Sequence, residues 1–388
     1  MKKAVMYGAG NIGRGFIGKV FSDSGYEVCF LDIVPAVINE LNSRHEYPVR
    51  IVANTGNHDE IVNNVRAVHA GSAEAVAEIA SCDIMATAVG VNVLPKIAPV
   101  IAKGIAARMG VGRTLDIILC ENQLEADKLM RGWIYEHLDE GQKKWADKNI
   151  GLVEASIGRM VPVMTPEQKA ENPLLVCVEP YAQLPVDSAA FRGAIPCDLV
   201  GLLPYSPFGL YIKRKLFIHN MGHAICAYMG AEKGYEYIWQ AVEDRTIYCA
   251  AREAMMASAH ALAREYGEEL MILLEEHVDD LLFRFKNRTL GDTVARVGGD
   301  PVRKIRRDDR LVGAALYCMG FGIAPAPIIN GIRSALKYNN TADVSAPALQ
   351  ADLHQKGLEY IIMRYMGLEV KDPLFERLQD QLGDDFKR

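Results

Sequence analysis

The chain has 388 residues, of which 50% are hydrophobic, and a formal net charge of -6. A chain of this length can bury a full hydrophobic core and is expected to form two domains. Its acidic balance provides no broad basic surface for nucleic acid or for an anionic membrane, so we expect a small-molecule partner instead.

Short apolar runs alternate with amphipathic runs through the first half of the chain. The apolar runs predict buried strands at residues 3–8, 27–32, 83–90 and 114–122. The amphipathic runs predict helices at residues 12–25, 36–45 and 93–110. This alternation predicts a Rossmann-type α/β domain with a doubly wound, mostly parallel sheet. Two further strands, at residues 151–157 and 173–180, are expected to extend the sheet region to about residue 195.

The pattern changes after residues 194–209, which are rich in proline and glycine. Long helical periods follow, for example at residues 246–267 and 349–367. The sequence therefore predicts a Rossmann-type domain over residues 1–200 and a mainly α-helical domain over residues 201–388. Neither the beginning of the chain nor any later run has the pattern of a signal peptide or a membrane helix.

A glycine-rich turn, GAGNIGRGFIG, directly follows the first predicted strand. Gly8, Gly10 and Gly13 have the GxGxxG spacing of dinucleotide-binding turns, and Asn11 and Ile12 complete the turn. In such turns the first glycine permits the tight turn, the second lets a pyrophosphate approach the backbone, and the third lets the helix pack on the strand. Free N–H groups at the helix N-terminus then face the phosphates.

Acidic and small residues at two later strand ends extend this nucleotide site. The second strand ends in Asp32, whose carboxylate can accept both ribose hydroxyls and would repel a 2′-phosphate, which favours NAD over NADP. The alternative is that Asp32 only caps the next loop. The strand at residues 83–90 contains Thr87, Ala88 and Val89, which we expect near the nicotinamide ribose.

The segment KRKLFIHNMGHA, residues 213–224, places polar side chains in an apolar helical run. At about 100° per residue, Lys215, Asn220 and His223 can line one broad face of a helix. Oxidation of an alcohol by NAD needs a base for the hydroxyl proton, and a lysine in an apolar setting can acquire a suitably low pKa. The structural alternatives are a solvated lysine and a core histidine.

Asparagine amides can stabilise the negative charge that develops on the substrate oxygen. The two candidates are Asn220 in this helical run and Asn122, which lies at the end of the strand predicted at residues 114–122. His223 could orient the substrate hydroxyl or the lysine amine, and His219 is its rival. Eight cysteines are scattered singly without zinc-ligand spacing, so we expect no metal, an organic base, and buried thiols in the reducing cytoplasm.

Blocks along nearly the whole chain resemble the polyol-specific long-chain dehydrogenases. In order, they are GAGNIGRGFIGK, IAPVIAKG, CEN, RMVP, RKLFIHNMGHAICAYMG and DPVRKIRRDDRL. The family signature of Lys, four residues, Asn, two residues, His matches Lys215, Asn220 and His223. The resemblance implies a zinc-independent enzyme in which Lys215 is the general base, Asn220 and Asn122 hold the oxyanion, and His223 contacts the substrate. It also implies an active site between the Rossmann and helical domains.

Two departures from the family pattern concern the substrate. Gly158 stands where the pattern has an acidic residue, and the segment 179–187 lacks an expected tryptophan. Neither touches the base or the nucleotide turn.

The resemblance implies a phosphorylated polyol or ketose as substrate. Arg303, Lys304 and Arg310 are the candidates for its phosphate, because arginine forks suit phosphate oxygens. The adjacent acids Asp308 and Asp309 leave a solvated helix face as the alternative. Rival functions are a sister activity on an unphosphorylated polyol or a hexuronate, and a catalytically silent NAD-binding sensor.

Overall fold

The computed structural model describes residues 1–121, 123, 125–162 and 164–387. By its internal contacts the chain divides into two compact units, unit 1 from Met1 to Gly209 and unit 2 from Leu210 to Arg388. The domain boundary that the sequence places between residues 200 and 201 stays a prediction. In the described residues, no helix combines the length and the apolar character needed to cross a membrane.

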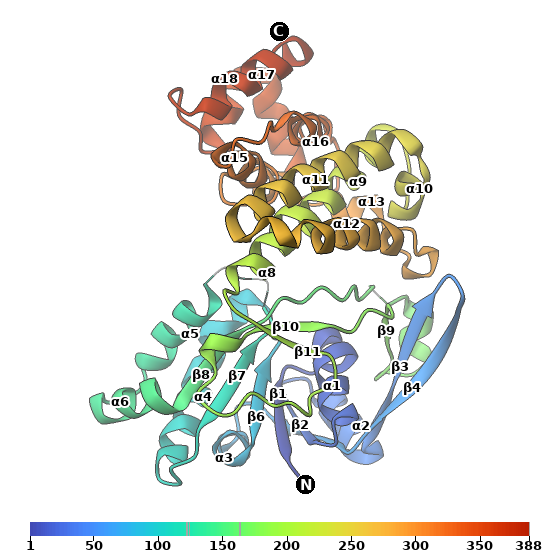
Figure 1. The fold of residues 1–388 in the computed structure, drawn as a ribbon. Helices are drawn as coiled ribbons and strands as arrows, with labels where there is room; N and C mark the ends of the chain where they lie inside the picture. Colours follow the sequence, from blue (N-terminus) through green and yellow to red (C-terminus); the bar gives the residue numbers. More distant parts are fainter. Residues whose placement is uncertain (122, 124, 163, 388) are drawn as a thin grey trace. The chain divides into compact units, whose positions relative to one another are not determined.

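Unit 1 is built around a six-stranded sheet in which every neighbouring pair is parallel (Figure 1). In spatial order the strands are β5 (Val65–His69), β2 (Glu27–Asp32), β1 (Lys3–Tyr7), β6 (Ile84–Thr87), β7 (Leu115–Leu119) and β8 (Ile150–Glu154). The order reverses between β1 and β6, and in such sheets the ligand crevice lies beyond the carboxyl ends of the strands at this point. The doubly wound sheet predicted from the sequence is confirmed.

Helices cover both faces of this sheet because successive strand residues point to opposite sides. Ala4 and Met6 belong to the hydrophobic cluster on one face, and Val5 and Tyr7 to the cluster on the other. The helical elements of unit 1 are η1 (Gly13–Gly18), α1 (Lys19–Asp23), α2 (Pro35–Arg44), α3 (Ala73–Ser81), η2 (Val91–Val93), α4 (Leu94–Met109), α5 (Ala126–Tyr135), α6 (Glu140–Asn149), α7 (Pro166–Glu171) and η3 (Ser188–Ala190).

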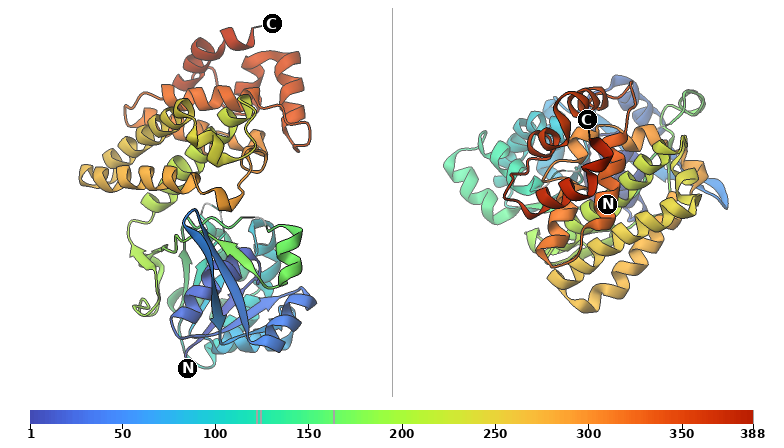
Figure 2. Two further views of the ribbon diagram at one scale, coloured as in Figure 1. Left: turned by 90° about the vertical axis from the view of Figure 1, so that its right-hand side faces the viewer. Right: turned by 90° about the horizontal axis from the view of Figure 1, so that it is seen from above.

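A second, three-stranded sheet contains a strand that the sequence assigned to the main sheet. The strand predicted at residues 173–180 forms β9 (Val176–Val178), which pairs in parallel with β3 (Glu46–Ala53). β3 also forms a hairpin with β4 (Gly56–Asn63), shown in blue in Figure 2. The free edge of β3, with which β9 pairs, lies more than 100 residues earlier in the chain. The periodicity of residues 173–180 alone cannot reveal such a partner. β10 (Leu184–Asp187) and β11 (Leu202–Tyr205) form a separate parallel pair.

Unit 2 is helical through the part of the chain that the structure describes, as the sequence predicts (Figures 1 and 2). Its elements are α8 (Gly209–Arg214), η4 (Lys215–Asn220), α9 (Met221–Glu232), α10 (Ile238–Glu243), α11 (Arg245–Tyr266), η5 (Glu268–Leu270), α12 (Met271–Phe285), η6 (Arg288–Leu290), α13 (Val294–Gly298), α14 (Pro301–Lys304), α15 (Val312–Gly320), α16 (Ala326–Lys337), α17 (Ala346–Arg364), α18 (Pro373–Leu382) and η7 (Asp384–Phe386).

The helix α9 is the centre of unit 2. It contacts α11, α13 and α16, and most of its side chains are buried, as expected for a helix that is apolar on all sides. Gly222 lets α11 approach, since a Cβ there would lie 2.4 Å from Met255 Sδ. The polar segment singled out in the sequence therefore runs directly into a largely buried helix of this unit.

Candidate active site

The glycine-rich turn lies at the switch point between β1 and β6, and its three glycines have different surroundings. Gly8 has a φ of +100°, and a Cβ there would lie 2.7 Å from Ala88 O. A Cβ at Gly13 would lie 1.9 Å from Gly8 O, so the helix cannot pack on the strand with a side chain at that position. A Cβ at Gly10 would meet no atom within 4 Å. The open approach at Gly10 fits the pyrophosphate of a dinucleotide.

A buried arginine lies directly after the third glycine and was not singled out in the sequence. Arg14 is 7% exposed, and its Nη1 donates to Ala9 O at 2.5 Å. Its Nε has no hydrogen-bond partner among the described groups, and burial lowers the pKa of the guanidinium. A bound anion would offset the cost of burying this charge. The donor set therefore also suits a dinucleotide phosphate.

Asp32 holds the loops on both sides of its strand end. One carboxylate oxygen accepts from Ala9 N at 2.7 Å, and the other accepts from Ile33 N at 2.7 Å and Val34 N at 2.9 Å. The capping role that the sequence left as an alternative is therefore present in the structure. A carboxylate has about four acceptor positions, so these three bonds leave capacity for a ribose hydroxyl.

The segment with Thr87, Ala88 and Val89 is fixed by an acid from the next strand end. Thr87 is fully buried and donates its hydroxyl to Glu121 Oε2 at 2.7 Å, while Val89 N donates to Oε1 at 2.9 Å. Ala88 N bonds Tyr7 O at 2.9 Å. The Thr87 hydroxyl is therefore occupied by a protein partner. Burial raises the pKa of Glu121, whose position after β7 was the one signal for this role in the sequence.

Two of the predicted catalytic residues of unit 2, Lys215 and Asn220, lie in a widened helical turn, and His223 lies in the helix that follows. Lys215 to Asn220 form the π-helix η4, which continues into α9. Such turns are frequent at functional sites, and they change the side-chain angles expected for a regular α-helix. Lys215 and Asn220 are half-buried, and the His223 side chain is 13% exposed. Asn122, the second predicted oxyanion residue, lies outside the described residues.

The two rival histidines have different surroundings. His223 stacks on Phe285 with ring centroids 4.4 Å apart, and its Nε2 lies 3.1 Å from Asp292 Oδ2. His219 is buried, and its pKa lies well below the ordinary value because of burial first and then nearby positive groups that include Arg284 and Lys215. His219 is therefore a neutral, enclosed side chain, which fits a core role.

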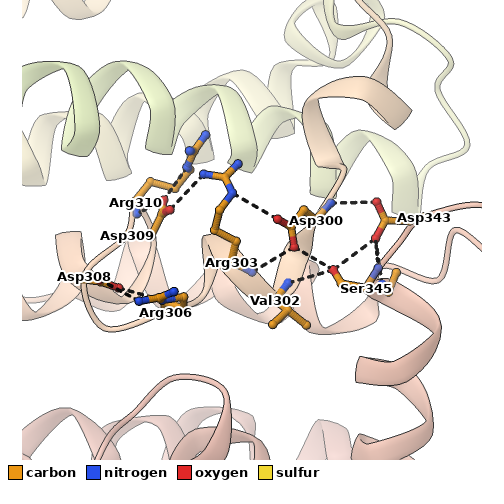
Figure 3. Close-up of polar contacts among 10 residues, drawn as sticks. Asp300, Val302, Arg303, Arg306, Asp308, Asp309, Arg310, Asp343 and Ser345 are labelled. Atoms are coloured by element: carbon orange, nitrogen blue, oxygen red, sulfur yellow. Dashed lines mark hydrogen bonds and ion pairs between the residues drawn. The ribbon is translucent and has the colours of Figure 1, made fainter. Parts of the chain in front are cut away.

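The basic segment near residue 305 is largely neutralised by its own acids (Figure 3). Arg303 lies 3.2 Å from both Asp300 and Asp309, and Arg310 Nε lies 2.7 Å from Asp309. Lys304 is buried, which, together with Arg310 and Arg303, lowers its pKa to about 7. Arg303 and Arg310 therefore already share the carboxylate of Asp309, and Arg303 also pairs with Asp300.

Two neighbouring arginines of this segment belong to a different surface. Arg306 and Arg307 line a hollow of about 630 Å³ together with Arg364. Arg306 pairs with Asp308, and Arg307 pairs with Asp372. Because α14 ends at Lys304, the segment is a short helix followed by a turn, and the regular solvated helix face considered from the sequence does not form.

The two departures from the family pattern meet in space. A Cβ at Gly158 would lie 3.3 Å from the ring of Tyr181, which belongs to the segment without the expected tryptophan. An acidic side chain at position 158 would press on this ring.

Within the described residues, no three His, Cys, Asp or Glu side chains are grouped as metal ligands.

Comparisons with known proteins agree with this architecture. The family described as mannitol dehydrogenase Rossmann domain matches residues 2–197, and the mannitol dehydrogenase C-terminal domain matches residues 209–385. A mannitol-1-phosphate 5-dehydrogenase from Brevibacillus brevis is 38% identical over 380 residues, which cover 97% of each chain.

Solved structures share the fold at low sequence identity. A ternary complex of Pseudomonas fluorescens mannitol 2-dehydrogenase with NAD and D-mannitol has a TM-score of 0.74 at 14% identity, covering 99% of this chain and 92% of that one. A substrate-free D-sorbitol dehydrogenase also has a TM-score of 0.74, at 15% identity, covering 99% and 91%. The resemblance seen in the sequence is confirmed, and the chain belongs to the mannitol dehydrogenase family.

Proposed function

We propose that this protein is an NAD-dependent, zinc-independent polyol dehydrogenase that interconverts mannitol 1-phosphate and fructose 6-phosphate. The observation that carries the proposal is the full-length similarity to the Brevibacillus enzyme. The open face at Gly10 and the buried cation of Arg14 support a dinucleotide in unit 1. Six of the eight free thiols are buried, and Cys197 and Cys249 are exposed. Free thiols are compatible with a cytoplasmic location, which we include in the proposal.

In the proposed reaction, NAD supplies the hydride acceptor. Lys215 takes the proton of the substrate hydroxyl while the carbon gives up its hydride and the carbonyl forms. Asn220 and Asn122 donate hydrogen bonds to the oxygen as its negative charge develops. His223 contacts the substrate and orients it. In the reduction of the ketose, Lys215 returns the proton and acts as the general acid.

The test of this proposal is NADH oxidation by the purified protein with fructose 6-phosphate, fructose and a set of hexuronates, with NADPH in parallel. We expect turnover with fructose 6-phosphate and NADH. Turnover with an unphosphorylated sugar or a hexuronate would assign a sister activity. NADH binding without any turnover would instead indicate the sensor.

Replacement of Asp32 is expected to change the choice of cofactor. Asp32→Ala should weaken NADH binding about 10-fold and narrow its advantage over NADPH, because it removes ribose acceptors and the repulsion of a 2′-phosphate. The measurement is the ratio of the two dissociation constants from fluorescence titrations.

If Asp32→Ala acted only by loosening the loops that Asp32 holds, it would weaken the binding of NADH and NADPH equally. The ratio of the two dissociation constants would then stay unchanged. Asp32→Asn, which keeps one acceptor oxygen for Ile33 N and Val34 N, serves as the milder comparison. An unchanged ratio in both variants would contradict the proposed role of Asp32.

Replacement of single basic side chains is expected to weaken the use of a phosphorylated substrate more than the use of an unphosphorylated one. We propose that Arg303, Lys304 and Arg310 hold the substrate phosphate. Each change to Gln should raise KM for fructose 6-phosphate about 10-fold or more and leave KM for fructose nearly unchanged, because a hydrogen bond between charged groups is lost.

Arg306→Gln is the matched control in the same segment, since Arg306 is exposed and pairs with Asp308. If Arg306→Gln selectively raises KM for fructose 6-phosphate, the phosphate site is instead the hollow lined by Arg306 and Arg307. If none of the four variants discriminates between the two sugars, the phosphate assignment is wrong.

A further inference from the structure

Asp292 connects His223 to a cation, and sequence analysis did not single it out. Its Oδ2 lies 3.1 Å from His223 Nε2, and its Oδ1 lies 2.7 Å from Arg296 Nε and 2.6 Å from Arg296 Nη2. The carboxylate is 11% exposed, and burial alone would raise its pKa. The pKa is nevertheless lowered, because His223 and Arg296 favour the charged form.

The backbone of Asp292 is held by bonds that do not involve its side chain. Asp292 O accepts from Ile238 N at 2.9 Å, and Val294 N donates to Glu236 O at 2.9 Å. Tyr237 and Thr293 form a β-bridge between the same two segments. The backbone of Asp292 is therefore tied to the segment that precedes α10.

His223 is restrained in two independent ways. Phe285 stacks on its ring at an interplanar angle of 11°, which fixes the plane of the ring. Asp292 Oδ2 lies 3.1 Å from the buried Nε2, which has no well-aligned hydrogen bond to any described group. At this distance the carboxylate is within reach of a hydrogen bond from Nε2–H. In the neutral ring, a proton on Nε2 leaves Nδ1 as the acceptor.

We propose that Asp292 is a positioning residue that holds the Nε2–H tautomer of His223, so that Nδ1 is the atom that accepts a hydrogen bond from a substrate hydroxyl other than the one that gives its proton to Lys215. Arg296 keeps the Asp292 carboxylate ionised and thereby keeps it an acceptor. The inference rests on the proposed substrate contact of His223, but the tautomer itself does not depend on which sugar is turned over.

The first test is the ¹⁵N NMR spectrum of histidine-labelled protein without substrate, recorded well above the ordinary histidine pKa of about 6.5. The His223 signals are identified by their loss in His223→Ala. We expect the Nε2–H tautomer in the wild type and a mixture in Asp292→Asn. An Nδ1–H tautomer in the wild type would overturn the proposal, whatever the enzyme's substrate.

The second test is a double-mutant cycle of Asp292→Asn and His223→Ala, with kcat/KM, NADH affinity and thermal midpoint measured for each protein. Asp292→Asn alone should lower kcat/KM about 10-fold, because a hydrogen bond to a charged group is lost, while NADH affinity stays unchanged. In the His223→Ala background it should have no further effect. Additive losses would show that Asp292 does not act through His223.

Two controls separate this role from general effects of charge. Asp279→Asn removes a carboxylate that pairs with Arg252 on the exposed side of α12, and it should leave kcat/KM unchanged. Arg296→Gln removes the other partner of Asp292 but keeps the contact with His223. A shift of the His223 tautomer in Arg296→Gln without one in Asp292→Asn would show that the arginine positions the ring, and the proposal fails.

Discussion

Lys215→Ala is expected to lower kcat by roughly 10²-fold or more while leaving NADH affinity nearly unchanged. The methyl group cannot take the hydroxyl proton, and the proposed cofactor ligands lie in unit 1, away from the substituted position in the sequence. Steady-state kinetics and NADH titration measure the two effects separately. Lys215→Arg should be about as inactive, because a guanidinium keeps the positive charge but does not deprotonate at working pH.

The matched control for this prediction is Lys213→Ala, two residues earlier. Lys213 pairs with Glu265 and lies over the rings of Tyr266 and Tyr317, so its positive charge serves packing in unit 2. This variant should lose some stability and keep most of its kcat. A Lys215→Ala enzyme that retains most of its rate, or an active Lys215→Arg enzyme, would show that Lys215 is not the base.

Alanine at two glycines of the nucleotide turn is expected to have different effects on stability. Gly13→Ala places a methyl group 1.9 Å from Gly8 O, and neither backbone can move away without separating η1 from β1. We expect a loss of about 3 kcal/mol or more in the free energy of unfolding, as for other severe overpacking. NADH binding should be lost with the turn. Thermal melting and NADH titration provide both readouts.

Gly10→Ala should fold as well as the wild type and bind NADH at least about 10-fold more weakly, because its methyl group occupies the approach of the pyrophosphate. Gly132→Ala in α5 is the control, since a Cβ there also meets no atom within 4 Å and the residue is exposed. It should leave NADH affinity unchanged. Equal NADH affinity in Gly10→Ala and the wild type would place the dinucleotide elsewhere.

The parallel sheet was predictable because its strands are buried on both faces and read as continuous apolar runs. The hairpin of β3 and β4 was missed, since Gly56–Asn63 is mostly polar and exposed. Residues 176–178, which the sequence assigned to the main sheet, pair with β3 of that hairpin instead. A strand can be recognised from its own residues, but its partner depends on which edge is free in the folded chain.

The sequence by itself determined the glycine turn, the two-part organisation and the signature with Lys215, because each depends on residues close together in the chain. Only the tertiary structure decided that Glu121 occupies the Thr87 hydroxyl, that His219 is enclosed, and that Asp292 faces His223. These contacts join residues far apart in the sequence, and helix and strand packing brings them together. The charge and protonation of such groups depend on burial and on partners from other elements, and no local pattern encodes either of them.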